Sequence, residues 1–265
     1  MHLRNMWVGT LGFALAATMA CGGGSSSTSS EPAAPAAGGA SGGQKVDPAT
    51  AGDVKGVVSF EGAAPKNEPI KMNADPVCVK ANTTPQFQET YAVEDGKLAN
   101  VFVYVKDGLG NYAFDPPTEM AKIDQMSCRY HPHVFGVRVN QPIEILNSDD
   151  TLHNIHALPK ANSEFNNGQP IKGMKMTHVF TSKEVMVPFK CDVHGWMNAY
   201  VGVLDHPYFA TTGKDGSFDL KGLPPGTYTI EAWHEKLGTQ TATVTIAAKE
   251  TKDANFSFKA AAATD

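Results

Sequence analysis

The strongest constraint on the fold is a strand-like pattern that runs from Asp53 almost to the end of the chain. Short apolar runs and stretches of alternating residues are broken repeatedly by Gly, Pro, Asn and Asp, as in strands joined by turns. The segments with this pattern are "VKGVVSF", "NVFVYVKDG", "VFGVRVN", "PIEILNS", "KMTHVF", "EVMVPFK" and "NAYVGVLD". No segment keeps a helical period for long, although residues 84–96 can hold a short turn of helix. We therefore predict an all-β fold built from sandwiches.

The N-terminal part of the chain lacks this pattern. Residues 1–20 combine Arg4 with the apolar run "WVGTLGFALAA", which is typical of a secretory signal. Cys21 follows at once, and the Gly, Ser, Ala and Pro-rich tract after it predicts a disordered linker over residues 21–52. The arrangement resembles a bacterial lipoprotein. That resemblance implies a chain exported to the periplasm or cell envelope and held at a membrane only through a lipid on Cys21. Thr18 stands where lipoproteins prefer Leu, Val or Ile, so release as a soluble exported protein stays open.

Composition limits the partners. The formal net charge is −5, and a mildly acidic surface argues against nucleic acid, because phosphate binding needs clustered cations. No stretch after the signal is long and apolar enough to cross a bilayer.

The cysteines fall into different roles. Apart from Cys21 and Cys191, which belongs to the motif below, the chain has Cys78 and Cys128. In an oxidising compartment these two are a plausible disulfide, and two separate buried thiols are the alternative. Closing a loop of about 50 residues would stabilise the fold by about 4 kcal/mol on the chain-entropy model.

The segment "FKCDVHGWM" carries the chemistry. It sets Cys191, His194 and Met197 at C-x2-H-x2-M spacing directly after an apolar strand. A soft thiolate with imidazole and thioether neighbours is the ligand set that selects copper, with the methionine as a weak axial ligand. A loop this short does not surround an ion by itself, so a second histidine must come from another strand end. His153, just after "PIEILNS", is the candidate.

With these residues in view, residues 126–204 resemble a cupredoxin, and most of all amicyanin and plastocyanin. A His-Asn pair follows a strand, and a Cys-His-Met loop lies near the end of the domain. The resemblance implies one mononuclear type 1 copper ion, with Asn154 tying the two ligand loops together by hydrogen bonds. The implied copper ligands are His153, Cys191, His194 and Met197. The alternative is that the cysteine is a structural core thiol.

Two domains are predicted. The first is a cupredoxin-like Greek-key β-sandwich over residues 53–204, in which residues 53–125 form an N-terminal extension of the 126–204 core. The second, over residues 205–260, contains a "DGSF" turn and a "LPPGTYTI" strand. These resemble the carboxypeptidase regulatory-like, transthyretin-like module, which implies a smaller β-sandwich. Such modules accompany many functions, so a glycan or protein ligand of this domain stays open.

Other residues can bind metal or pack. His131 and His133 share one face of an extended backbone and suggest either a second metal position or a surface turn. Met174, Met176 and His178 also alternate onto one face, which favours core packing but is compatible with a Cu(I) delivery surface. The residues predicted to serve only in packing are His206, Tyr208 and His234.

The resemblance implies a one-electron transfer protein, not an enzyme, because a copper ion held by four protein ligands keeps no open position for a substrate. Trp196, between two ligands, is expected at the copper end beside an exposed imidazole edge where an unidentified redox partner protein docks. Two alternatives remain: a periplasmic copper carrier or buffer, and an envelope binding module in which copper is secondary.

Overall fold

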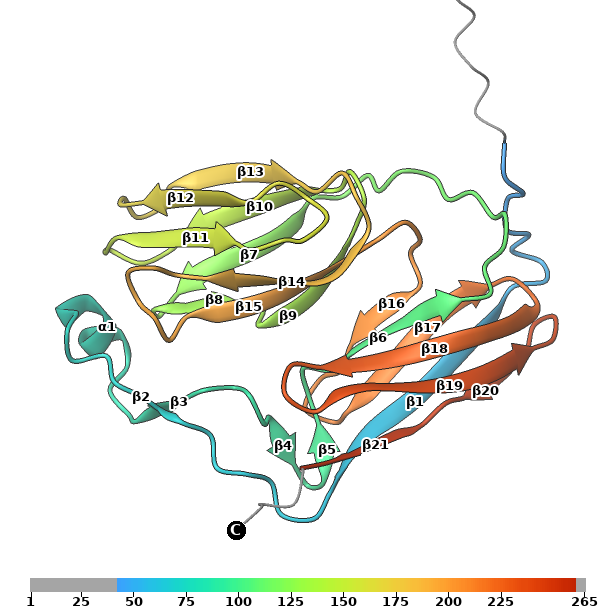
Figure 1. The fold of residues 1–265 in the computed structure, drawn as a ribbon, viewed down its shortest axis with the longest axis horizontal. Coiled ribbons are helices and arrows are strands. Elements are labelled where there is room, and N and C mark those ends of the chain that lie inside the picture. Colours follow the sequence, from blue (N-terminus) through green and yellow to red (C-terminus); the bar gives the residue numbers. More distant parts are fainter. Residues whose placement is uncertain (1–41, 261–265) are drawn as a thin grey trace, which may run out of the picture. The chain divides into compact units, whose positions relative to one another are not determined.

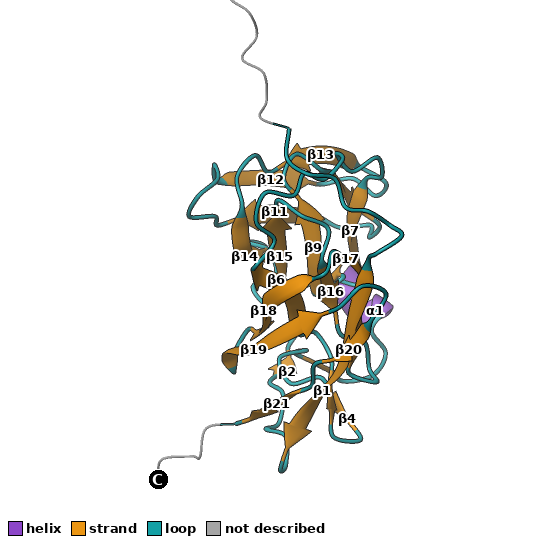
Figure 2. Ribbon diagram, turned by 90° about the vertical axis from the view of Figure 1, so that its right-hand side faces the viewer, coloured by secondary structure: helices purple, strands orange, loops and turns teal. Residues whose placement is uncertain are grey.

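The computed structural model describes residues 42–260, so the predicted signal, Cys21 and most of the predicted linker lie outside the described residues. The described chain is built from strands, with α1 (Pro76–Ala81) as its one α-helix (Figure 2). The described residues contain no helix that is long and apolar enough to span a membrane. The predicted all-β class is therefore confirmed. The linker ends earlier than predicted, because the amide of Gln44 already donates to the carbonyl of Asn111.

One sandwich, here the inserted sandwich, is built from consecutive strands between residues 121 and 204 (Figure 1). Its first sheet has the order β12 (Phe165–Gln169), β11 (His153–Ala157), β14 (Glu184–Lys190), β15 (Asn198–Leu204), β9 (Val134–Arg138). Its second sheet has the order β13 (Lys175–Val179), β10 (Pro142–Asn147), β7 (Ala121–Met126), β8 (Arg129–His131). Strand β10 illustrates the pattern behind the prediction, since Ile143 and Ile145 point into the core and their neighbours are only half-buried.

The other sandwich, here the split sandwich, combines strands from both ends of the described chain. Its first sheet contains β17 (Ser217–Leu223), β1 (Gly52–Glu61), β5 (Lys97–Leu98) and β4 (Val93–Glu94), with β20 (Thr251–Asp253) and β21 (Phe256–Lys259) also paired to β1. Its second sheet has the order β16 (Phe209–Thr211), β6 (Phe102–Asp107), β18 (Gly226–His234), β19 (Gly238–Ile246). Side chains of both sheets meet in one core, for example Val58 of β1 and Ile230 of β18.

This topology differs from the predicted domain order. The prediction assigned residues 53–125 to the cupredoxin-like domain, whereas β1 pairs with β17 and β6 pairs with β18. The inserted sandwich thus interrupts the split sandwich between β6 and β16. Strand β6 is apolar on both faces because Val103 packs in the split core and Phe102 packs in a cluster with Val134 of the inserted sandwich.

The connection between β1 and β6 carries β2 (Pro69–Ile70), β3 (Gln86–Phe87) and α1. The helix begins after Asp75, whose carboxylate accepts hydrogen bonds from the amides of Val77 and Cys78. Pro76 occupies the first turn of the helix. The short helix considered for residues 84–96 is absent, since β3 and β4 lie there instead. Cys78 and Cys128 form a disulfide, which joins α1 to the turn between β7 and β8.

Candidate metal centre

The four predicted ligands come from two places in the inserted sandwich. His153 is the first residue of β11, and the other three lie in the loop that joins β14 to β15. The loop closes on itself, because the amide of Met197 donates to the His194 carbonyl at 2.8 Å and the Cys191 amide donates to the Met197 carbonyl at 3.2 Å. Strand β14 pairs with β11, which brings the loop beside His153.

The structure places three of these groups around a common point. The Nδ1 atoms of His153 and His194 lie 2.9 Å apart, and these two residues and Cys191 each offer a ligand atom within 4.8 Å of the others. The exposed fractions are 0% for His153, 2% for Cys191, 3% for His194 and 1% for Met197. Met197 packs in the same core cluster as Cys191. Residues far apart in the sequence therefore meet in one buried pocket.

Asn154 lies between the two ligand segments, as its predicted role requires. Its Oδ1 accepts from the Cys191 thiol at 3.2 Å and from the amide of Asp192 at 2.7 Å. One side chain following the first histidine thus fixes both the sulfur and the start of the ligand loop.

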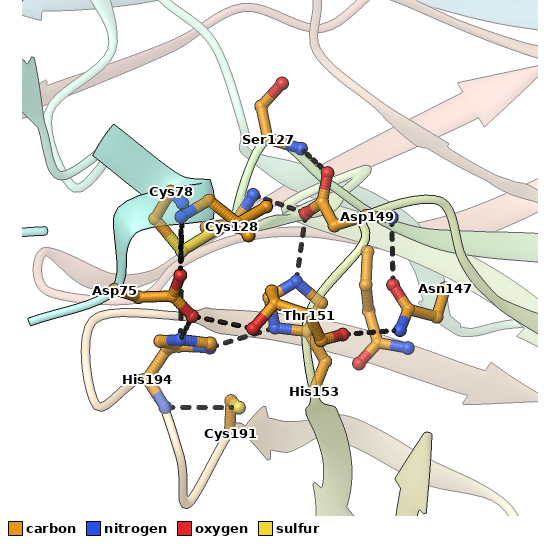
Figure 3. Close-up of polar contacts among 12 residues, drawn as sticks. Asp75, Cys78, Ser127, Cys128, Asn147, Asp149, Thr151, His153, Cys191 and His194 are labelled. Carbon is orange, nitrogen blue, oxygen red and sulfur yellow. Dashed lines mark hydrogen bonds and ion pairs between the residues drawn. A yellow bond between two sulfur atoms is a disulfide. The ribbon is translucent and has the colours of Figure 1, made fainter. Parts of the chain in front are cut away.

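Each ligand histidine binds a carboxylate through its far nitrogen (Figure 3). Nε2 of His153 lies 2.9 Å from Asp149, and Nε2 of His194 lies 3.0 Å from Asp75. A carboxylate only accepts, so both Nε2 atoms carry hydrogen and the Nδ1 lone pairs face each other. At 2.9 Å these lone pairs repel unless a proton or a metal ion lies between them. The pocket is therefore arranged for a cation.

The pKa shifts of Cys191, His153 and His194 agree with this arrangement. Burial raises the pKa of the Cys191 thiol, but the neighbouring His153 and hydrogen bonds from backbone amides outweigh it and leave the pKa below its ordinary value. Burial lowers the pKa of His153, but Asp149 and the thiol outweigh that effect and raise it. Burial and the charge on His153 together hold the pKa of His194 low. These shifts favour the ionised form of Cys191 and the protonated form of His153, relative to the free side chains.

These residues fit copper. Two imidazole nitrogens, one thiolate and a nearby thioether are the donor set of a type 1 site, and the carboxylates orient the imidazoles as outer partners commonly do. The carboxylates behind both rings hold the hydrogen on Nε2 and leave the Nδ1 lone pair of each ring free to bind a metal. His153, Cys191 and His194 would hold the ion, with Met197 as the expected axial neighbour.

The expected exposed imidazole edge is absent, which corrects that prediction. His194 is buried because Asp75 and the Cys78 sulfur, 3.7 Å from Nε2, cover its outer edge. Trp196 is half-buried, lies 5.0 Å from His194 between ring centroids, and donates to the Cys128 carbonyl at 2.9 Å. The segment around α1 therefore closes this end of the inserted sandwich.

Among the described residues, no group of metal ligands gathers around the two histidines considered for a second metal position. Nε2 of His133 lies 2.6 Å from Glu235 and its Nδ1 lies 3.1 Å from the Asn198 carbonyl. His131 belongs to none of the potential metal clusters among the described residues. His133 instead joins the two sandwiches, since Glu235 directly follows β18.

The remaining candidates, apart from Met174, are packing residues. Met176 packs against the inserted core, and the ring of His178 stacks on Phe165 with centroids 3.9 Å apart. Met174 is 38% exposed at the surface before β13. The residues predicted to serve in packing, all of them buried, are His206, Tyr208 and His234.

Sequence reasoning missed Asp75 and Asp149 as partners of the ligands. Asp149 lies four residues before His153. The Asp-Pro pair at residues 75–76 is a helix-start signal that identifies the cap but not its histidine partner.

The comparison with family models agrees with the resemblance of the C-terminal part to the carboxypeptidase regulatory-like module. The model of the carboxypeptidase regulatory-like domain matches residues 197–259, from β15 through β21. No curated protein matches the sequence. The structural neighbours include cupredoxins. One neighbour is a copper-containing nitrite reductase from Thermus scotoductus SA-01, with 18% identity over 37% of this chain and 24% of that chain and a TM-score of 0.31.

Two further neighbours are small. A purple cupredoxin from Nitrosopumilus maritimus is 22% identical over 31% of this chain and 98% of its own, with a TM-score of 0.28. An amicyanin variant in its Cu(I) form is 17% identical over 38% of this chain and 97% of its own, with a TM-score of 0.29. This chain spans less than two thirds of the nitrite reductase but nearly all of these two proteins.

Proposed function

We propose that this chain is an exported protein that binds one copper ion in a mononuclear type 1 site and transfers single electrons. The observation that carries the proposal is the convergence of His153, Cys191 and His194 on one buried point. Copper held there would supply reversible one-electron exchange, and the fixed ligand pocket would keep rearrangement small. Lipid anchoring through Cys21 and residence in the periplasm or cell envelope belong to the same proposal.

An electron carrier suits the site better than an enzyme. Four protein groups are available to fill the coordination sphere, so no position is left for a substrate. We expect a redox partner protein to dock at the ligand end of the inserted sandwich, near Trp196. The covered edge of His194 implies that electrons pass through side chains packed around the site, and not through an exposed imidazole.

The experiment is a copper titration of the metal-free protein. Cu(II) should produce a strong visible thiolate-to-copper band at one ion per chain. Cys191→Ser should abolish the band, while Ser182→Ala, a surface change outside the pocket, should keep it. A colourless wild-type protein that releases Cu(I) readily would contradict the proposal and favour a copper carrier.

A copper carrier or buffer is the second candidate, but the burial of all four groups favours slow exchange. A binding module is the third. It would be favoured by a protein that takes up no copper and binds a polysaccharide or protein through the split sandwich.

A further inference from the structure

Asp149 is fixed by three hydrogen bonds behind one ligand histidine (Figure 3). Its Oδ2 accepts from Nε2 of His153 at 2.9 Å and from the amide of Cys128 at 2.7 Å. Its Oδ1 accepts from the amide of Ser127 at 2.8 Å. The turn that holds Cys128 therefore sets the position of this carboxylate.

Asp75 plays the equivalent part behind the other histidine. Its Oδ1 accepts from the amides of Val77 at 2.8 Å and Cys78 at 3.4 Å, which also caps α1. Its Oδ2 accepts from Thr151 at 2.7 Å and lies 3.0 Å from Nε2 of His194. These hydrogen bonds outweigh the effect of burial and hold the pKa of Asp75 at about 2, so it is ionised at neutral pH.

The disulfide links the two arrangements. Each half-cystine donates its backbone amide to one of the carboxylates, and the Cys78–Cys128 bond joins them across 50 residues of sequence. Asp75 belongs to the connection between β1 and β6, outside the inserted sandwich that supplies every ligand. The disulfide is the covalent link that keeps this connection on the ligand pocket.

We propose that Asp75 and Asp149 are positioning residues for the two histidine ligands, held as a pair by the disulfide between their neighbours. The inference rests on the proposed function, because it concerns the copper that those histidines would bind. Each carboxylate keeps hydrogen on Nε2 and leaves Nδ1 free for the metal. The negative charges of the half-buried Asp75 and the buried Asp149 behind the imidazoles also stabilise Cu(II) more than Cu(I). Their removal should therefore raise the reduction potential.

The test is the copper reduction potential of Asp75→Asn and Asp149→Asn, each purified as the full chain. Asparagine keeps the size of the side chain and removes its charge. We expect each variant to shift the Cu(II)/Cu(I) equilibrium toward Cu(I) at least tenfold, which is about 59 mV for one electron. Asp150→Asn is the matched control, because Asp150 is exposed and makes no hydrogen bond to either ligand histidine among the described contacts.

The disulfide has its own test. The double variant Cys78→Ala/Cys128→Ala should shift the potential in the same direction as Asp75→Asn. Without the disulfide, the segment that carries Asp75 and α1 leaves the ligand histidines part of the time. Adding Asp75→Asn to that double variant should then change the potential less than it does in the wild type. Equal effects in both backgrounds would contradict the role of the disulfide.

A measurement on the wild type guards against variants that lose copper or fail to fold. Nitrogen-15 NMR of the Cu(I) form, which is diamagnetic, should detect slowly exchanging Nε2–H groups on both His153 and His194. Rapid exchange at either nitrogen, or potentials in the Asp variants that match Asp150→Asn, would overturn the proposal. A wild-type protein without the thiolate-to-copper band would instead overturn the proposed function, so the two failures are distinct.

Discussion

The ring of Phe102 in β6 lies against Gly202 in β15, so the split sandwich and the inserted sandwich meet at a glycine. A Cβ atom built on Gly202 would come within 2.5 Å of that ring. Gly136 of β9 lies opposite Gly202 in the same sheet, and a Cβ there would come within 2.7 Å of the same ring. The two glycines thus leave room for the ring of Phe102, and the ring of Phe209 also lies against Gly136.

Gly202→Ala should lower the free energy of unfolding by about 1–3 kcal/mol, because the added methyl group overpacks the contact with Phe102. Urea unfolding measures this change. Adding Phe102→Leu should recover part of the loss, and the control Gly168→Ala should have little effect, since its Cβ would meet only Leu152 at 3.9 Å. A Gly202→Ala protein as stable as the wild type would show that the Phe102 ring can move away from the added methyl group at no cost in stability.

Replacing both Cys78 and Cys128 by alanine should lower the free energy of unfolding by about 4 kcal/mol on the chain-entropy model. The reason is that the unfolded chain regains the freedom of a long closed loop. Denaturant unfolding of the variant and of the wild type with and without a thiol reductant measures the effect. Reduced wild type should match the variant. A difference under about 1 kcal/mol between oxidised and reduced wild type would contradict the expected stabilisation.

His234 should make the fold sensitive to acid. Burial lowers its pKa from 6.5 to about 4, so the folded protein resists protonation while the unfolded chain takes up a proton below pH 6.5. The free energy of unfolding is therefore undiminished by this histidine above pH 6.5. It falls by about 3 kcal/mol as the pH drops to about 4.

His234→Asn tests this, because its amide oxygen can still accept from the amides of Lys236 and Leu237, as Nδ1 does now. Between pH 7 and pH 4 the wild type should lose about 3 kcal/mol more unfolding free energy than the variant. Equal losses would mean that the histidine is protonated in the folded state at little cost.

Local sequence patterns predicted the strands and the ligand loop because both depend on neighbouring residues. Side chains alternate along β10, and Cys191, His194 and Met197 lie within one short loop. The loop even fixes its own closure, through the amide of Met197 and the carbonyl of His194. Those features needed no knowledge of distant strands.

The insertion and the covered histidine could not be predicted in this way, because they depend on pairings between distant segments. The side chain of Asn255 accepts from the amide of Val57 across 198 residues, and Asp75 reaches His194 across 119 residues. The apolar run around Phe102 was compatible with any buried strand, since burial on both faces removes the alternation that reports which side is packed.

The last prediction concerns metal release. Because Asp75, Cys78 and Trp196 cover the outer edge of His194, a chelator should remove copper slowly from the wild type. Trp196→Ala removes the ring that packs on His194 and the donor to the Cys128 carbonyl, so the cover should open more often. Stopped-flow transfer of Cu(I) to a coloured chelator should then be at least tenfold faster.

The matched control for this experiment is Val193→Ala. Val193 is adjacent to His194 in the same loop but is 47% exposed and takes no part in covering the ring. Its copper transfer should match the wild type. If the wild type already releases copper as fast as Trp196→Ala, the cover does not limit exchange, and a copper carrier becomes the better account of this chain.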